Sequence, residues 1–238
     1  MKIAFLSDIH ANFPALCAAL ECAERLGAEG VVCAGDLVGG GPHPTEVIRL
    51  LMERRIPAIL GNVDRKVLRL ASSPKKRRQA LKGKRAPLAW TAKALGGPEL
   101  RWLQGLPAEL HLVFGAAAVR VVHGSPLSDT DYIYPSLTPE ALAAKLGDDR
   151  PAVLVCGHSH IPFTKRVSGV LVANCGSVGR PVDGDPRGSF ALGDFPGGGR
   201  AAARTVRFAF ALDAVTGDLA SRGVPGAAPE EIRRGTRR

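Results

Sequence analysis

The chain opens with the stretch MKIAFLSDIH, residues 1–10, in which an apolar run ends on a serine, an aspartate and a histidine. A short apolar run bounded by polar residues predicts a buried strand over residues 2–7 rather than a signal peptide. Because side chains alternate along an extended chain, Asp8 and His10 are expected to project to the same side and to be able to share one ion. The opening therefore predicts a core strand that ends in two candidate ligand side chains.

The part of the chain that follows alternates strand-like runs with amphipathic helical stretches. Further strand-like runs cover residues 30–34 and 57–60, and apolar side chains at helical spacing mark residues 14–26 and 44–54. This alternation is typical of βαβ units, which feed a largely parallel sheet. A chain of 238 residues, of which 45% are hydrophobic, can bury one large core. We therefore expect an α/β fold with a single domain over residues 1–222.

The second half is expected to be strand-rich. A short helix with Thr138 as its N-cap interrupts the strands. The expected strands cover residues 109–114, 118–122, 153–156, 162–167, 170–174, 189–192 and 205–212. From residue 223 to residue 238 the content of Pro, Gly, Ala and Arg predicts a flexible, frayed tail.

The positive charge of the chain is concentrated in one segment. The formal net charge is +10, and eleven Lys or Arg residues, without any acid, lie between residues 65 and 98. We interpret residues 65–106 as a helical, basic segment. Clusters of this kind bind nucleic-acid backbones but are more often solvated faces, so nucleic acid is possible as a partner and is not favoured. Trp90 and Trp102 have apolar spacing that favours core packing over base stacking.

Polar side chains with ligand atoms follow five of the expected strands. These residues are Asp8, His10, Asp36, Asn62, His123, His158 and His160. Ligands in open α/β sheets gather at the carboxyl ends of strands, and the neighbouring glycines allow the backbone to turn sharply there. Four imidazoles, two carboxylates and one amide exceed the needs of one tetrahedral ion and suit two. Nitrogen and oxygen donors without thiolate favour Mn, Fe, Co, Ni or Zn over Ca or Mg alone.

The order of these motifs resembles the calcineurin-like metallophosphoesterase superfamily. Asp-x-His, Gly-Asp, Gly-Asn-x-Asp, His-Gly and Gly-His-x-His occur in the order found in that family, and the runs at residues 174–181 and 183–187 resemble its small bacterial and archaeal phosphodiesterase-like branch. The resemblance implies a four-layer α/β/β/α sandwich of two mixed sheets with a dimetal centre at one edge. The helical segment 65–106 would shape the opening to the substrate.

The resemblance also implies a ligand for each position and a reaction. Asp8, His10 and His160 would hold one divalent ion, and Asn62, His123 and His158 the other, with Asp36 bridging both. A water between the ions would lose a proton near neutral pH and attack a phosphate ester in line. We expect a metal-dependent phosphoesterase, with a phosphodiesterase favoured over a phosphomonoesterase, a protein phosphatase or a nuclease. A protein-interaction scaffold on the same fold, as in a retromer subunit, is the non-enzymatic alternative, and loss of ligands would be its sign.

Other positions carry open interpretations. Many members of the family have a leaving-group histidine where this chain has Val63, so we expect a preference for good leaving groups or the use of another proton donor. Asp64 is either a catalytic group that orients water or ligand, or a structural cap. Arg180 either binds the substrate phosphate or stabilises a turn, and the same choice holds for Arg187. His43 and His111 lack partners in any motif and are not expected to be ligands.

The remaining features concern the cellular location of the protein and the state of its cysteines. No stretch of eighteen apolar residues occurs, so we expect no membrane association and a cytoplasmic location. The five cysteines are scattered, without Cys-x-x-Cys spacing, which predicts buried free thiols. Manganese is among the candidates for the native metal. The sequence indicates neither the oligomeric state nor the physiological substrate.

Overall fold

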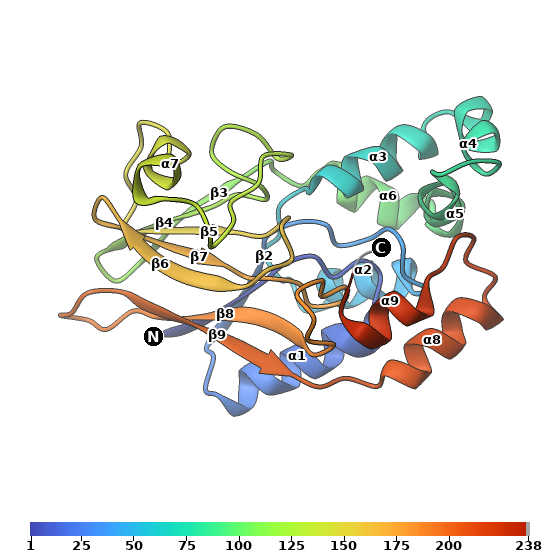
Figure 1. Cartoon of the computed structure of the whole chain (residues 1–238). Coiled ribbons are helices and arrows are strands. Elements are labelled where there is room, and N and C mark those ends of the chain that lie inside the picture. The colour runs from blue at the N-terminus through green and yellow to red at the C-terminus, as the bar shows by residue number, and fades with distance from the viewer. Residues whose placement is uncertain (237–238) are drawn as a thin grey trace.

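Two mixed β-sheets form the centre of the protein in a computed structural model that describes residues 1–236 (Figure 1). The first sheet has the order β2-β1-β8-β9, with β1 at Lys2–Leu6, β2 at Gly30–Cys33, β8 at Gly188–Asp194 and β9 at Ala202–Phe208. The second has the order β3-β4-β5-β7-β6, with β3 at Leu110–Phe114, β4 at Ala117–Val121, β5 at Val153–Cys156, β6 at Phe163–Val167 and β7 at Val170–Asn174. In the first sheet only β1 and β2 are parallel, because β8 runs antiparallel to β1 and β9 runs antiparallel to β8. In the second sheet the central strands β4, β5 and β7 are parallel, and the edge strands β3 and β6 are antiparallel to their neighbours.

The helices are distributed around these sheets. They are α1 (Phe13–Arg25), α2 (Pro44–Glu53), α3 (Asn62–Ala71), α4 (Pro74–Ala80), α5 (Ala86–Ala94), α6 (Gly97–Gln104), α7 (Pro139–Ala144), α8 (Leu212–Ser221) and α9 (Pro229–Arg234). The expected cap is present, because Thr138 accepts the N–H of Ala141 at the start of α7. Asn12, which was not predicted as a cap, accepts the N–H of Ala15 at the start of α1 in the same way.

The burial of β1 explains why the opening stretch is continuously apolar. Ala4 and Leu6 face one core, which packs against α1 and α2, whereas Ile3 and Phe5 face a second core between the two sheets. A strand buried on both faces needs apolar side chains at every position rather than at alternate ones. A third core, built around Leu142 of α7, covers the outer face of the second sheet. These four layers confirm the expected α/β/β/α architecture (Figure 1).

Several expected elements differ from the structure. Residues 57–60 form only an isolated bridge between Cys33 and Ala58, because Leu60 turns to bond Pro107 and a helix begins at Asn62. The last expected strand ends at Phe208, and residues 212–221 are helical. The expected helical segment 65–106, by contrast, does begin in a regular helix, which covers residues 62–71 and buries Val67 and Leu70.

The C-terminal residues also differ from the expectation of a frayed tail. Residues 229–234 form α9, and the amide of Gly184 donates to the carbonyl of Gly235 at 2.8 Å. Residues 237 and 238, the end of the expected tail, lie outside the described residues.

The described residues bear on two further expectations, which concern membrane-spanning helices and the state of the cysteines. None of the helices in residues 1–236 is long and apolar enough to cross a membrane. All five cysteines are free thiols; Cys33, Cys156 and Cys175 are buried, whereas Cys17 and Cys22 are partly exposed.

Candidate metal centre

The predicted ligands lie at one edge of the sandwich, on loops that leave the strands in an uncommon conformation. Asp8, His10, Asp36, His158 and His160 all have positive φ, between 50° and 63°. Such angles are rare in residues other than glycine and are retained mainly where the surrounding structure needs them. Their concentration in the predicted ligands indicates that the backbone is shaped to aim these side chains.

Asp8 and His10 lie close together as expected, but the alternation of side chains along a strand is not the cause. The strand β1 ends at Leu6, so neither residue belongs to extended chain. Their loop is held by backbone hydrogen bonds from Asp8 to Gly35 and from His10 to Asp36, each 3.0 Å long. The pair is therefore aligned by the neighbouring loop after β2 rather than by strand geometry.

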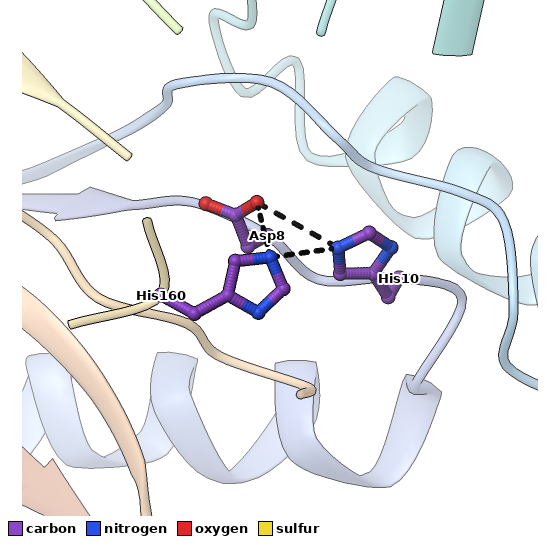
Figure 2. A group of neighbouring side chains, drawn as sticks. All are labelled: Asp8, His10 and His160. Carbon is purple, nitrogen blue, oxygen red and sulfur yellow. Dashed lines mark hydrogen bonds and ion pairs between the residues drawn. The ribbon is translucent and has the colours of Figure 1, made fainter. Parts of the chain in front are cut away.

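Asp8, His10 and His160 form the first group of ligand atoms (Figure 2). Asp8 Oδ1 lies 3.0 Å from His160 Nε2 and 3.6 Å from His10 Nε2, and the two Nε2 atoms are 3.2 Å apart. The Nδ1 atom of His10 faces the Gly39 carbonyl at 2.9 Å, and that of His160 faces the Arg180 carbonyl at 2.5 Å. In neutral rings, each Nδ1 therefore carries the proton, and the Nε2 lone pairs converge with the carboxylate on one point.

Asp36, His123 and His158 form the second group. His123 donates from Nδ1 to the Ala34 carbonyl at 2.8 Å, which turns its Nε2 toward Asp36 Oδ2 at 3.3 Å and Asn62 Oδ1 at 3.2 Å. Asp36 Oδ2 also lies 3.8 Å from His10 Nε2 in the first group. Asp36 is thus the carboxylate between the two groups, which is the position expected for a bridging ligand.

Two buried ligand atoms of the centre lack the hydrogen bonds that burial normally requires. Among the described residues, neither Asp8 Oδ1 nor His158 Nε2 has a hydrogen-bond partner. An unpaired buried polar atom is costly, and a cation at each group would satisfy both atoms. The donor set of imidazole, carboxylate and amide without thiolate fits divalent transition metals. The residues present therefore fit two metal ions.

The electrostatics of the site keep its carboxylates ionised. Burial raises the pKa of Asp8, but His160 and His10 outweigh it and hold this pKa well below its usual value; His123 likewise lowers the pKa of Asp36 against the effect of burial. Burial lowers the pKa of His10 and His158, which favours neutral rings that can act as ligands. Asp8 and Asp36 therefore present anionic oxygens, and His10 and His158 present neutral nitrogens, as a cation requires.

His123 differs from the other imidazoles. Burial acts to lower its pKa, but the carboxylates of Asp36 and Asp8 prevail and raise it to about 10. A proton on this ring competes with a cation for the negative charge of Asp36.

Asp64 lies next to the centre but is fully buried beneath it. Its Oδ2 accepts the N–H groups of Leu37 at 3.2 Å and Gly61 at 3.0 Å, and its Oδ1 accepts that of Val38 at 3.0 Å. Burial, with the nearby charge of Asp36, raises its pKa to about 7. Both oxygens are thus used to tie the loop after Asp36 to the start of α3, which favours the capping interpretation over a catalytic one.

Arg180 lines the cavity above the ligands, and its Nη2 donates to Glu231 Oε2 of α9 at 3.2 Å. Arg187 lies apart from the ligands and pairs with Asp185. The two histidines that were not expected to be ligands lie outside both groups. His43 is buried and contacts Asp218 of α8 at 2.8 Å, whereas His111 is exposed beside Glu109 in β3.

A cavity of about 440 Å³ opens over the two groups. Sequence reasoning missed the part of its lining that comes from α8 and from the chain around α9, including Val215, Leu219 and Ile232. It also missed Tyr132, whose ring stacks on that of His158 with centroids 4.2 Å apart. A signal for α9 was available, because Pro229 at the start, acids in the first turn and Gly235 at the end are typical of a short helix.

With this geometry established, comparison with known proteins gives the family. Residues 1–198 match the model of the calcineurin-like phosphoesterase superfamily domain. The chain belongs to the calcineurin-like phosphoesterase superfamily. The resemblance seen in the five motifs is thereby confirmed.

Relatives of this phosphoesterase come from archaea and bacteria. It is 29% identical over 209 residues to the uncharacterized protein MJ0912 of Methanocaldococcus jannaschii, covering 81% of this chain and 82% of that protein. It is 29% identical over 196 residues to the phosphodiesterase YfcE of Escherichia coli K12, covering 78% of this chain and 84% of YfcE. The crystal structure of a metallophosphoesterase from Sphaerobacter thermophilus aligns with a TM-score of 0.81 and 26% identity over 99% of both chains.

Proposed function

We propose that this phosphoesterase is a phosphodiesterase that depends on two divalent cations. Asp8, His10 and His160 would hold one cation, Asn62, His123 and His158 the other, and Asp36 both. The observation that carries the proposal is the pair of buried ligand groups that meet at Asp36, with Asp8 Oδ1 and His158 Nε2 lacking partners among the described residues. The similarity to the phosphodiesterase YfcE supports the diester preference.

Two divalent cations in such a site supply Lewis acidity toward phosphoryl oxygens and lower the pKa of water. The protein's own residues keep the ligands in place: carbonyl groups fix the imidazole rings of His10, His123 and His160, and Tyr132 stacks on His158. For Asp64 we propose a positioning role, because its carboxylate holds the loop that carries Asp36. For Arg180 we propose substrate binding, with Glu231 holding the guanidinium at the cavity wall.

The complete set of ligands supports an enzyme over a protein-interaction scaffold. All seven expected positions carry residues that can bind a metal, and all seven are buried at one edge of the fold. The nitrogen and oxygen donors suit Mn, Fe, Co, Ni or Zn as the native metal.

The test is hydrolysis of bis-p-nitrophenyl phosphate and p-nitrophenyl phosphate by metal-stripped protein, before and after addition of Mn, Ni, Zn or Mg. Asp36→Asn removes one charge from the bridging position, and Asp148→Asn, at an exposed acid remote from the ligands in sequence, is the matched control. We expect metal-restored turnover of the diester in the wild type and in Asp148→Asn, with loss in Asp36→Asn. If turnover did not depend on metal, or survived in Asp36→Asn, the proposal would be wrong.

A further inference from the structure

The cavity above the metal centre is walled by segments that are far apart in the chain. One wall comes from α3 and the chain leading into α5, with Lys66, Lys84 and Leu88. Another comes from α8 and the chain around α9, which Figure 1 shows at the same end of the molecule as α5. Most of the candidate ligands follow strands of the two sheets, whereas helices and loops outside the sheets determine the shape of the cavity above them.

The C-terminal segment, defined here as residues 224–236, forms one wall of this partly open cavity. At one end, a methyl group placed on Gly226 would lie 3.5 Å from Pro87 of α5, so the two residues are in contact range. Further along, Glu231 pairs with Arg180, and Gly235 accepts a backbone hydrogen bond from Gly184. The segment thus reaches from the helical segment to the loop after Arg180.

The resulting volume limits what can enter. At about 440 Å³ the cavity falls within the range of about 300–1,000 Å³ that is typical of small-molecule sites. The cavity is partly open to solvent, and its walls can hold a small molecule between them. The geometry favours a small substrate.

The charge of the wall is not balanced within the protein. Lys66 and Lys84 are exposed where they line the cavity, and neither ammonium group has an ion pair or a hydrogen bond among the described residues. The acids in the lining are already engaged, because Asp36 faces His123 and Glu231 faces Arg180. Two lysines without acidic partners remain available to an anionic group other than the one held by the metal centre.

The lining at the start of α3 is consistent with a phosphate as leaving group. Val63 borders the cavity beside the ligand Asn62, and its side chain has no proton to give to a departing oxygen. An alkoxide departs slowly without an acid, whereas a phosphate departs as a stabilised anion whose charge lysine side chains can hold.

Resting on the proposed phosphodiesterase function, we propose that the substrate is a small molecule in which the attacked phosphate is joined to a second phosphate. Lys66 and Lys84 bind that second phosphate. The oxygen of water bonds to the attacked phosphorus, the bond from this phosphorus to the bridging oxygen breaks, and the bridging oxygen leaves on the second phosphate. The two phosphate monoesters that result release the two protons of water to the solvent at neutral pH.

The experiment compares a substrate with two linked phosphates, ADP-ribose, with bis-p-nitrophenyl phosphate, which has one. Full-length protein is assayed with Mn as wild type, Lys66→Ala, Lys84→Ala and Lys66→Arg, with Lys75→Ala on the exposed face of α4 as the matched control. We expect each alanine variant at the wall to raise KM for ADP-ribose about tenfold, as for the loss of one charge-assisted contact, with kcat within about twofold. KM for bis-p-nitrophenyl phosphate stays within about twofold, and both Lys66→Arg and Lys75→Ala resemble the wild type.

Two kinetic outcomes would overturn the proposal. Equal losses on both substrates would place the lysines at the attacked phosphate, and an unchanged KM for ADP-ribose would remove them from binding. Cleavage of a single-stranded DNA oligonucleotide as efficient as that of ADP-ribose would contradict the preference for a small substrate.

Binding separates this proposal from the phosphodiesterase proposal itself. Equilibrium dialysis of ADP and AMP against the wild type and the Lys66→Ala, Lys84→Ala double variant requires no turnover. We expect the wild type to prefer ADP over AMP by at least about tenfold and the double variant to lose this preference. If no diester were hydrolysed, the proposed phosphodiesterase function would be wrong, but a preference for ADP over AMP would still support a second phosphate site. If the wild type showed no such preference, the second phosphate site itself would be wrong.

Discussion

Replacing Asp64 with alanine distinguishes a positioning carboxylate from a catalytic one. The carboxylate accepts three backbone N–H groups, from Leu37, Val38 and Gly61, and all three residues are buried. In Asp64→Ala these donors lose their acceptor, and each unsatisfied buried donor costs about 1–3 kcal/mol. Removing the buried charge returns part of this cost. We expect a net loss of about 3–5 kcal/mol in the free energy of unfolding.

The assay for this prediction is thermal unfolding of metal-stripped protein by calorimetry. For a chain of this size about 1 kcal/mol corresponds to about 2–4 °C, so the melting temperature should fall by about 6–20 °C. Asp148→Ala, at an exposed position, is the control and should change it by little. Turnover, measured below the melting temperature and at saturating metal, should fall less than about tenfold.

A catalytic role for Asp64 predicts the reverse pattern. Loss of a general acid or base typically reduces turnover by about 10²–10⁴-fold. An unchanged melting temperature together with a loss of at least about 100-fold at saturating metal would refute the positioning interpretation.

Three further predictions concern metal, core and pH. Mn²⁺ at about 100 times its Kd should stabilise the wild type by about 2.7 kcal/mol, seen as a higher melting temperature, and His158→Ala should reduce this gain; an equal gain would exclude His158 as a ligand. Phe190→Ala, at a fully buried ring of β8, should lower the free energy of unfolding measured by chemical denaturation by about 3–5 kcal/mol. Val113→Ala, at a side chain that is 71% exposed, should lower it by less than about 0.5 kcal/mol. Similar losses in the two variants would contradict the core assignment. Hydrogen bonding and charge from Arg187 lower the pKa of Asp185 from 3.8 to about 2, so its contribution to stability is present above pH 3.8 and is lost as the pH falls through about 2. The melting-temperature difference between wild type and Asp185→Asn should therefore narrow between those two pH values, and a difference that widened would show that the pair does not act this way.

The layers of the fold could be predicted because their signals are continuous in the sequence. The opening strand is apolar at each of Ile3, Ala4, Phe5 and Leu6, and the structure buries alternate members of this run in two different cores. Such a strand has no solvent face, which places it at the centre of a layered α/β fold. The run 57–60 carried a similar apolar signal and failed as a strand because the helix that starts at Asn62 follows too closely.

The C-terminal segment could not be placed from the sequence, although its helix could have been found. A helix of six residues has no buried side chain of its own to indicate what it packs against. Its position depends on the pair between Arg180 and Glu231, which are 51 residues apart, and on the contact of Gly226 with Pro87. Ion pairs and close approaches of this kind leave no periodic pattern. Sequence reasoning therefore missed the part of the cavity wall that comes from the C-terminal segment, although it expected the helical segment 65–106 to shape the opening.

The clustering of the candidate ligands was predictable for a different reason, because their motifs determine packing as well as chemistry. A methyl group on Gly61 would lie 2.2 Å from the amide nitrogen of Asp36, and one on Gly157 would lie 2.0 Å from Ser7 Oγ and 2.5 Å from Asp8 Oδ2. These glycines let loops from both sheets approach one another closely enough for the ligand atoms to meet. A motif such as Gly-Asn-x-Asp or Gly-His-x-His therefore specifies the spacing between loops together with the donor atoms. This double constraint is why five short motifs located the centre, whereas single residues outside them, such as Tyr132 and Lys66, needed the structure.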